Sequence, residues 1–270
     1  MRSWVPAEIY RPIPRNVLFY DGPSRLNGER ILAIATAQNG NRKIGPMLQL
    51  WIMPAISPIV AVKTGRDAAV CGDCRLRGDG TGGGRVCYVE HWRAVENIWQ
   101  SQRRADRTDR LDVATLAQRV AGVQLRIGAY GDPVAVPLEV WQPLLAVAGG
   151  WTAYSHQWRR DDLTDGYRTW CMASVDSHVE RSDAQRRGWR TFRVRQVGGP
   201  VENSEIICPH ERDSDIKCAD CSLCRGAARP AKDIVVTVHG SGGLKHFSRA
   251  PVDVAPRLIT IRSLRRTNAR

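Results

Sequence analysis

Long apolar runs are missing from this sequence of 270 residues. No stretch reaches the roughly 20 apolar residues that a membrane-spanning helix needs. The segment Met1–Pro14 carries charges and three prolines instead of the apolar core of a secretory signal. With 43% hydrophobic and 25% charged residues, the chain has the composition of a folded globular protein and is long enough to bury a sizeable core. We therefore expect a soluble protein of the cytoplasm, without a membrane partner.

Lysine is scarce as well, because only five of the 40 basic residues are lysines and the others are arginines. Against 27 acidic residues they leave a net charge of +13 and an isoelectric point near 9.9. Such a surplus permits electrostatic attraction to a polyanionic partner, such as a nucleic acid or a nucleotide substrate. Arginines that only cover a solvated surface would produce the same surplus. Nothing in the sequence indicates an oligomeric state.

Several catalytic and binding motifs are absent. The chain has no G-x-S-x-G and no H-E-x-x-H, which argues against a hydrolase of either type. The glycine-rich stretch 78–84 lacks the Lys-Ser/Thr pair of a phosphate-binding loop, so we interpret it as a linker. No helix-turn-helix or Cys-Cys/His-His finger pattern is present either. The chemistry must therefore come from other residues.

Cysteine, in contrast, is abundant. Eight cysteines in a reducing compartment indicate metal binding more than disulfides. The most specific pattern is Cys208-x9-Cys218-x2-Cys221-x2-Cys224, the C-terminal cysteine group, in which x2 spacings turn successive thiolates toward one centre. Three cysteines at consecutive x2 spacings with a remote Cys-Pro favour an iron–sulfur cluster. A structural zinc site is the alternative.

The N-terminal cysteine group, Cys71-x2-Cys74-x12-Cys87, has three thiols without a close fourth cysteine. A 4Fe-4S cluster with three protein ligands leaves one iron free for a substrate or for S-adenosylmethionine, and we predict such a cluster here. A zinc site completed by His91 or Cys171, or three unrelated buried thiols, are the alternatives. Cys171 lies in a predicted strand, where a buried thiol is ordinary, and we leave it out of the site.

From about residue 90, helical and strand patterns alternate, which predicts parallel βα units. The predicted fold is α/β, a parallel βα-unit barrel or partial barrel, with a doubly wound sheet as the alternative. We predict an N-terminal arm and β-rich segment (1–65), a barrel-like domain with both cysteine groups (66–240) and a basic tail (241–270). Predicted turns lie at 21–23 and 27–28, and a solvated loop at 103–110. The predicted strands are 31–37 and 48–53, which form a hairpin, then 124–128, 151–155, 170–175, 190–194, 204–208 and 234–238. The predicted helices are 91–103, 112–121, 137–148 and 179–188.

Polar residues follow most of these strands. In parallel α/β folds, ligands bind where the strands end. Asp132, His156 and Asp176 each follow a predicted strand, so a parallel barrel would bring them to one rim. We predict that they are the catalytic residues, that they share a cavity with the N-terminal cysteine group, and that the backbone of Gly131 lies close to a ligand.

Much of the chain, from about residue 17 to residue 240, resembles a widespread family of cysteine-rich phage and prophage proteins. That resemblance implies a phage or prophage origin. The stretches that carry it are Tyr20–Ser24, Asn41–Lys43, Cys71–Cys74, Cys87–Val89, Gly128–Pro133, Tyr154–Arg159, Met172–Ser177, Gly188–Arg193 and the C-terminal cysteine group.

The order of elements is also loosely similar to radical S-adenosylmethionine (radical SAM) enzymes. A three-cysteine site after an early strand precedes βα units, a glycine-rich strand exit and a C-terminal cysteine cluster. The C-x3-C-x2-C spacing of that superfamily is absent. The similarity implies that Gly128, Gly131 and Asp132 bind S-adenosylmethionine, with Arg159 beside them.

Two functions are therefore open. The first is a phage-encoded iron–sulfur enzyme of radical SAM type that modifies a nucleotide or a nucleic acid. The second is a non-catalytic nucleic-acid-binding protein, in which arginines contact phosphates and structural zinc or iron–sulfur sites hold the fold.

Overall fold

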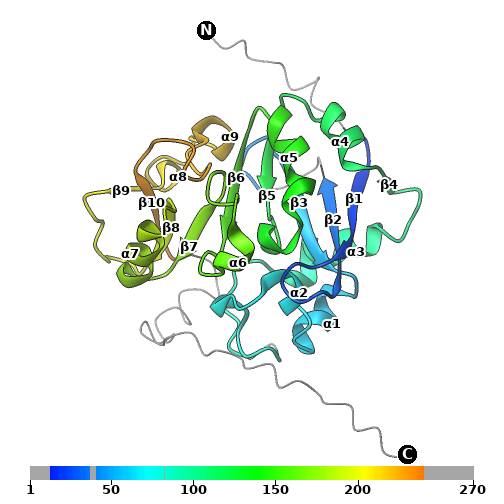
Figure 1. The fold of residues 1–270 in the computed structure, drawn as a ribbon, viewed down its shortest axis with the longest axis horizontal. Helices are drawn as coiled ribbons and strands as arrows, with labels where there is room; N and C mark the ends of the chain where they lie inside the picture. The colour runs from blue at the N-terminus through cyan, green and yellow to red at the C-terminus, as the bar shows by residue number, and fades with distance from the viewer. Residues whose placement is uncertain (1–12, 37–40, 82, 240–270) are drawn as a thin grey trace, which may run out of the picture.

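The computed structural model describes residues 13–36, 41–81 and 83–239. Within these residues the strands form a ten-stranded sheet in the order β4-β1-β2-β3-β5-β6-β7-β8-β10-β9 (Figure 1). The strands are β1 (Asn16–Pro23), β2 (Arg30–Thr36), β3 (Leu48–Pro54), β4 (Thr108–Arg110), β5 (Gln124–Ile127), β6 (Gly150–Ser155), β7 (Met172–Val175), β8 (Thr191–Arg195), β9 (Glu205–Ile207) and β10 (Asp233–Thr237).

The relative direction of neighbouring strands changes from antiparallel to parallel at β3. Strands β1, β2 and β3 are antiparallel neighbours, and β2 and β3 form the predicted hairpin, with Ile34 opposite Trp51. From β3 to β9 all neighbouring strands run parallel. The prediction of an α/β protein with a mostly parallel sheet is therefore confirmed. The three N-terminal strands belong to the same sheet and the same hydrophobic core as the later ones.

Two of the longer helices, α4 and α7, begin at a residue whose side chain caps the helix. Asp112 accepts a hydrogen bond from the Thr115 amide (2.8 Å) at the start of α4 (Val113–Arg119). Ser177 does the same for the Glu180 amide (3.1 Å) at the start of α7 (His178–Arg186). The helix predicted over 137–148 is α5 (Leu138–Val147), which packs against α4 (Figure 1). The other helical segments are α1 (Pro58–Lys63), α2 (Ala68–Cys71), η2 (Arg75–Arg77), η3 (His91–Val95), α3 (Glu96–Ser101), η4 (Pro133–Ala135), α6 (Asp161–Thr164), α8 (Pro209–Arg212) and α9 (Cys218–Cys221).

The two faces of the parallel strands have different surroundings. One face packs into the main core, whose largest fully buried side chains include Trp141, Trp158 and Tyr167. The other face lines a cavity, because successive side chains of a strand point to opposite sides. The strand residues on the cavity side are Arg126, Thr152, Tyr154, Ser174, Phe192, Val194, Ile234 and Val236.

One local prediction was wrong, and two others are confirmed only in part. The expected turn at 21–23 is the end of β1, where Asp21 lies opposite Leu32 in the antiparallel ladder. The expected solvated loop at 103–110 is present and exposed over 103–107, but its last three residues form β4, which pairs parallel with β1 and so satisfies backbone groups along that strand. The expected helix over 91–103 forms, but with a break at Arg93 between η3 and α3.

The proposed basic tail (241–270) and the first 12 residues of the proposed arm lie outside the described residues. Among the helices that the structure does describe, none is long and apolar enough to cross a membrane.

Candidate functional site

A cavity of about 460 Å³ brings the two cysteine groups together. All seven cysteines of the N-terminal and C-terminal groups line it, although the groups are far apart in the sequence. The eighth, Cys171, is buried in the main hydrophobic core instead. All eight cysteines are free thiols. The cavity is therefore the place where thiol chemistry of this chain is concentrated.

A buried carboxylate organises the loop that carries the N-terminal group. Asp67, only 1% exposed, accepts hydrogen bonds from Arg77 (2.6 Å) and Arg85 (3.1 Å). These two arginines flank the glycine-rich stretch 78–84, so one anchor holds both ends of that stretch. The backbone oxygen of Asp67 also accepts from the amide of Cys71 (2.9 Å) at the end of α2. Ion pairs of the Asp67 side chain and a hydrogen bond of its backbone therefore both fix the conformation of this loop.

Buried polar atoms without a hydrogen-bond partner surround the N-terminal cysteine group. They are Nε and Nη2 of Arg85, the hydroxyl of Tyr130 and Nε2 of His156. Arg85 and Tyr130 interact electrostatically with Cys71, and His156 does so with Cys74. Unsatisfied donors beside thiols suit an iron–sulfur cluster, whose sulfur atoms accept hydrogen bonds.

Burial also makes these thiols poor acids when nothing binds them. It raises the pKa of Cys71 well above the usual value and raises that of Cys87. Burial likewise raises the pKa of Cys224 to about 12, and the neighbouring thiols of the C-terminal group add to it. A bound metal would supply the positive charge that deprotonated thiols need in such surroundings. The chemical type of the donors in both groups is therefore the one that thiolate-bound metals and clusters use.

The C-terminal group is assembled by three short segments. Cys208 follows β9 and precedes α8, while α9 begins at Cys218. The amide of Cys218 donates to the backbone oxygen of Lys43 (3.0 Å), which fastens α9 to the segment before β3. Ser222 then adopts a left-handed conformation (φ 49°) that turns the chain so that Cys224 also faces the cavity.

Within the described part of the chain, no three His, Cys, Asp or Glu side chains are grouped to hold one metal ion. Thiolates around one zinc ion lie about 3.8 Å apart, whereas thiolates of a cubane bind separate iron atoms and need not approach so closely. His91 lies outside the cavity lining, with its ring edge-on to Trp92.

Asp132 ties the exits of β5 and β6 together. Its carboxylate accepts hydrogen bonds from the Val134 amide (3.0 Å), the Ser155 hydroxyl (2.8 Å) and the His156 amide (2.8 Å). Burial raises the pKa of Asp132, against the opposing effect of these bonds. Asp132 lines the cavity, as predicted from its place after a strand, and it positions His156 there.

His156 lies next to the N-terminal cysteine group, among neighbours that favour its protonated form. Burial lowers the pKa of His156, but Cys74, Asp176 and Asp132 raise it to about 10 overall. The side chain of Asp176, which is 5% exposed, lies outside the cavity lining in which it was predicted, so it acts on the site through His156. Burial raises the pKa of Asp176 as well.

The remaining predicted site residues divide between the cavity and the outside. Gly128 and Gly131 line the cavity, and both have a left-handed backbone (φ 74° and 80°). Arg159 lies outside the lining, because it stacks on Trp158 (3.9 Å) and pairs with Glu180 (3.1 Å).

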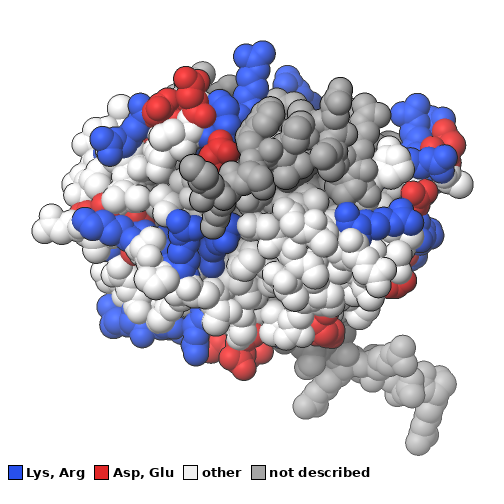
Figure 2. Space-filling model, turned by 90° about the horizontal axis from the view of Figure 1, so that it is seen from above, with Lys and Arg blue, Asp and Glu red and all other residues white. Residues whose placement is uncertain are grey.

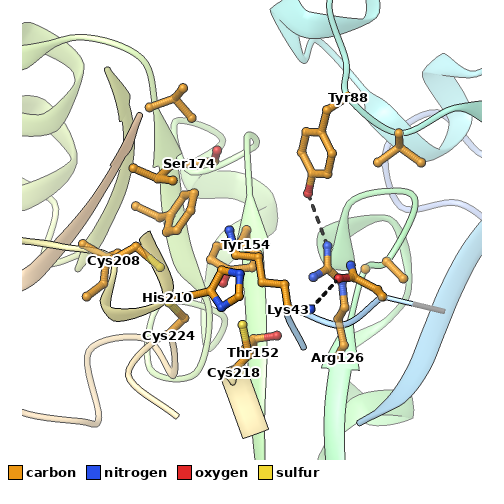
Figure 3. A pocket seen from close by; sticks show the side chains of 18 of the residues that line it. Lys43, Tyr88, Arg126, Thr152, Tyr154, Ser174, Cys208, His210, Cys218 and Cys224 are labelled. Carbon is orange, nitrogen blue, oxygen red and sulfur yellow. Dashed lines mark hydrogen bonds between the residues drawn. The ribbon is translucent and has the colours of Figure 1, made fainter. Parts of the chain in front are cut away.

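Sequence reasoning missed several cavity residues. Figure 3 shows Arg126 with its hydrogen bond from Nη2 to the Tyr88 hydroxyl (3.3 Å) on one side and three cysteines of the C-terminal group on the other. Lys43 and Tyr154 lie between them in that view. The one available signal was a charged residue inside an otherwise apolar strand, QLRIG, at Arg126.

Comparison with known proteins gave no match to this chain, whether by family model, by curated sequence or by solved structure.

Proposed function

We propose that this protein is a phage-encoded iron–sulfur enzyme of radical SAM type that acts on a nucleotide or a nucleic acid. One observation carries the proposal: both cysteine groups line the same cavity, which lies against one face of the parallel strands β5, β6, β7, β8 and β10. A metal site that only stabilises the fold does not need to face a cavity, whereas a reactive cluster must be accessible to the substrate.

In this proposal each group holds a 4Fe-4S cluster. The three thiolates of the N-terminal group leave one iron open for S-adenosylmethionine, and the four thiolates of the C-terminal group complete a second cluster. When bound, the open cluster with S-adenosylmethionine supplies radical chemistry, including hydrogen abstraction from an unreactive carbon.

The residues of the chain then have separate tasks. The loop from Gly128 to Asp132 lines the cavity. It is held against β3 because the amides of Gly128 and Ala129 both donate to the backbone oxygen of Leu50. Asp132 orients His156, whose positive charge balances the negative charge of the thiolates. Arg85 and Tyr130 offer further donors to the same thiolates.

A partial barrel is the architecture that suits this site. The side chains of β5, β6, β7, β8 and β10 that face the cavity come from one face of the sheet. The opposite face is covered by helices, as in parallel barrels that bind ligands at their strand ends.

Metal analysis of anaerobically purified protein tests the proposal. We expect about eight iron and about eight sulfide per chain, the sum for two cubanes. On reduction with dithionite, the loaded protein should convert S-adenosylmethionine to methionine and 5′-deoxyadenosine. A Cys171→Ala variant is the matched control, because it removes a thiol from the core and none from the cavity. Zinc without iron would overturn the proposal.

The net charge of +13 favours a second candidate, a nucleic-acid-binding protein with structural metal sites. On the face drawn in Figure 2, lysine and arginine side chains are dispersed, with acidic side chains among them. Tight DNA binding that weakens steeply with salt, by a protein that holds only zinc, would support this candidate instead.

A further inference from the structure

Arg126 lines the cavity and, unlike several other arginines of this protein, pairs with no carboxylate of the described residues. Arg193 pairs with Glu205 (2.6 Å), and Arg77 pairs with Asp67 (2.6 Å). Among the described residues, Arg126 has no acidic side chain within ion-pair distance, and its hydrogen-bond partner is the Tyr88 hydroxyl (3.3 Å). A guanidinium that faces a cavity without an anion is a candidate for binding one.

A second polar group beside Arg126 also lacks a partner. Thr152 lies on β6 directly opposite Arg126 in the parallel ladder, and both side chains line the cavity. Thr152 is 2% exposed, and its hydroxyl is buried without a hydrogen-bond partner in the described structure. Buried hydroxyls are nearly always satisfied in native proteins, so this one points to a group that is missing.

The wider cavity is cationic. Besides Arg126, its lining contains Lys43 and Lys217, together with His210 and His239. The carboxylate in the described lining is that of Asp132, which is occupied by three hydrogen bonds from the protein. The Cys218 amide donates to the backbone oxygen of Lys43 (3.0 Å), and the Lys43 side chain lies between Arg126 and Cys218 in the view of Figure 3.

We infer that Arg126 and Thr152, with Lys43 nearby, bind an oxyanion group of the substrate, a phosphate or a carboxylate. A guanidinium and a hydroxyl on adjacent strands can donate to different oxygens of one such group. The site lines the same cavity as the two cysteine groups, so the anchored molecule would sit within the reactive space. This inference rests on the proposed function only in calling the ligand a substrate.

The test is calorimetric titration of the full chain, loaded anaerobically with iron and sulfide. The probes are the deoxynucleoside 5′-monophosphates with their parent nucleosides, and glutarate with its neutral diamide. We expect one anionic probe to bind and its neutral partner to bind at least about tenfold more weakly. A monophosphate response identifies a phosphate, and a glutarate response identifies a carboxylate.

Variants assign the effect to named residues. Arg126→Met should weaken the anionic probe about 10- to 100-fold, because a charge-assisted hydrogen bond is lost. Thr152→Val should weaken it about 3- to 10-fold, and Thr152→Ser should restore it. Arg119→Met is the matched control, since Arg119 is an exposed arginine on α4. If Arg126→Met does not fold, Arg126→Lys and Thr152→Val decide the question.

Iron and sulfide are measured for every variant, so that the outcomes stay distinct. Failure of wild-type protein with intact clusters to bind any anionic probe would overturn the inference. Unchanged binding by Arg126→Met would do the same. Loss of iron from Arg126→Met or Thr152→Val would show that these residues serve a cluster, and would also overturn it. Protein without iron that still binds an anion through Arg126 would overturn the proposed function and support the inference.

Discussion

A methyl group added at Gly131 would enter the backbone of β3. A Cβ atom at this position would lie 2.4 Å from the carbonyl oxygen of Ile52 and 2.7 Å from its Cβ. Gly131 also has φ +80°, a conformation that side chains disfavour. Gly122 provides a matched control, because its φ is +77° but a Cβ there would meet nothing within 4 Å.

The two substitutions to alanine separate strain from collision. At Gly122 the left-handed conformation alone should cost about 1–2 kcal/mol. At Gly131 the methyl group stands about 1 Å closer to a backbone oxygen than an ordinary contact of 3.4 Å. That oxygen belongs to a central strand of the sheet and cannot swing away, so overpacking should add about 1–3 kcal/mol.

Thermal unfolding followed by circular dichroism measures the difference, with both variants prepared at the same metal content. For a protein of this size, about 1 kcal/mol shifts the Tm by about 2–4 °C. Gly131→Ala should therefore melt about 2–12 °C below Gly122→Ala. Equal losses in the two variants would refute the reasoning, because they would show that β3 yields to the methyl group without cost.

Three further predictions concern the cysteine groups and their rim. Cys221→Ala should give metal-poor or insoluble protein, because four thiolates around one centre couple metal binding to folding; full metal content with native melting would contradict this. Cys74→Ala should lose about four irons and leave the C-terminal group loaded, as measured by iron analysis, and equal loss from both groups would show that they are not independent. Asp132→Asn should lower the Tm by about 2–12 °C, because the amide cannot accept on both sides and leaves a buried donor unsatisfied at a cost of about 1–3 kcal/mol. An unchanged Tm would show that the three hydrogen bonds of Asp132 do not anchor the rim.

Most elements could be predicted because their signals are local. The strand predicted at 124–128 and the helix predicted at 137–148 each match an observed element to within one or two residues. The polar turn after β2 allowed the hairpin to be predicted as well. The strand β4 could not be predicted, because Thr108–Arg110 has no apolar pattern and is a strand only through its pairing with β1.

The candidate site could be predicted in part for the same reason. Asp132 and His156 follow strands, and parallel strands bring their ends together, so their shared cavity was predictable. Asp176 follows a strand too, yet its side chain lies outside the lining and reaches the site through His156. Position after a strand says which edge a residue is near, but the direction of its side chain depends on the packing of the following loop.

The sequence by itself determined the chemistry that the chain can offer: seven cysteines in two spaced groups, glycines at a strand exit and a surplus of arginine. Only the tertiary structure decided that both cysteine groups face one cavity, and that Arg126 and Thr152 lie side by side in the wall of that cavity. The physical reason is that spacing along the chain controls contacts within a few residues. Contacts between distant segments depend on which strands pair and which face of the sheet the helices cover.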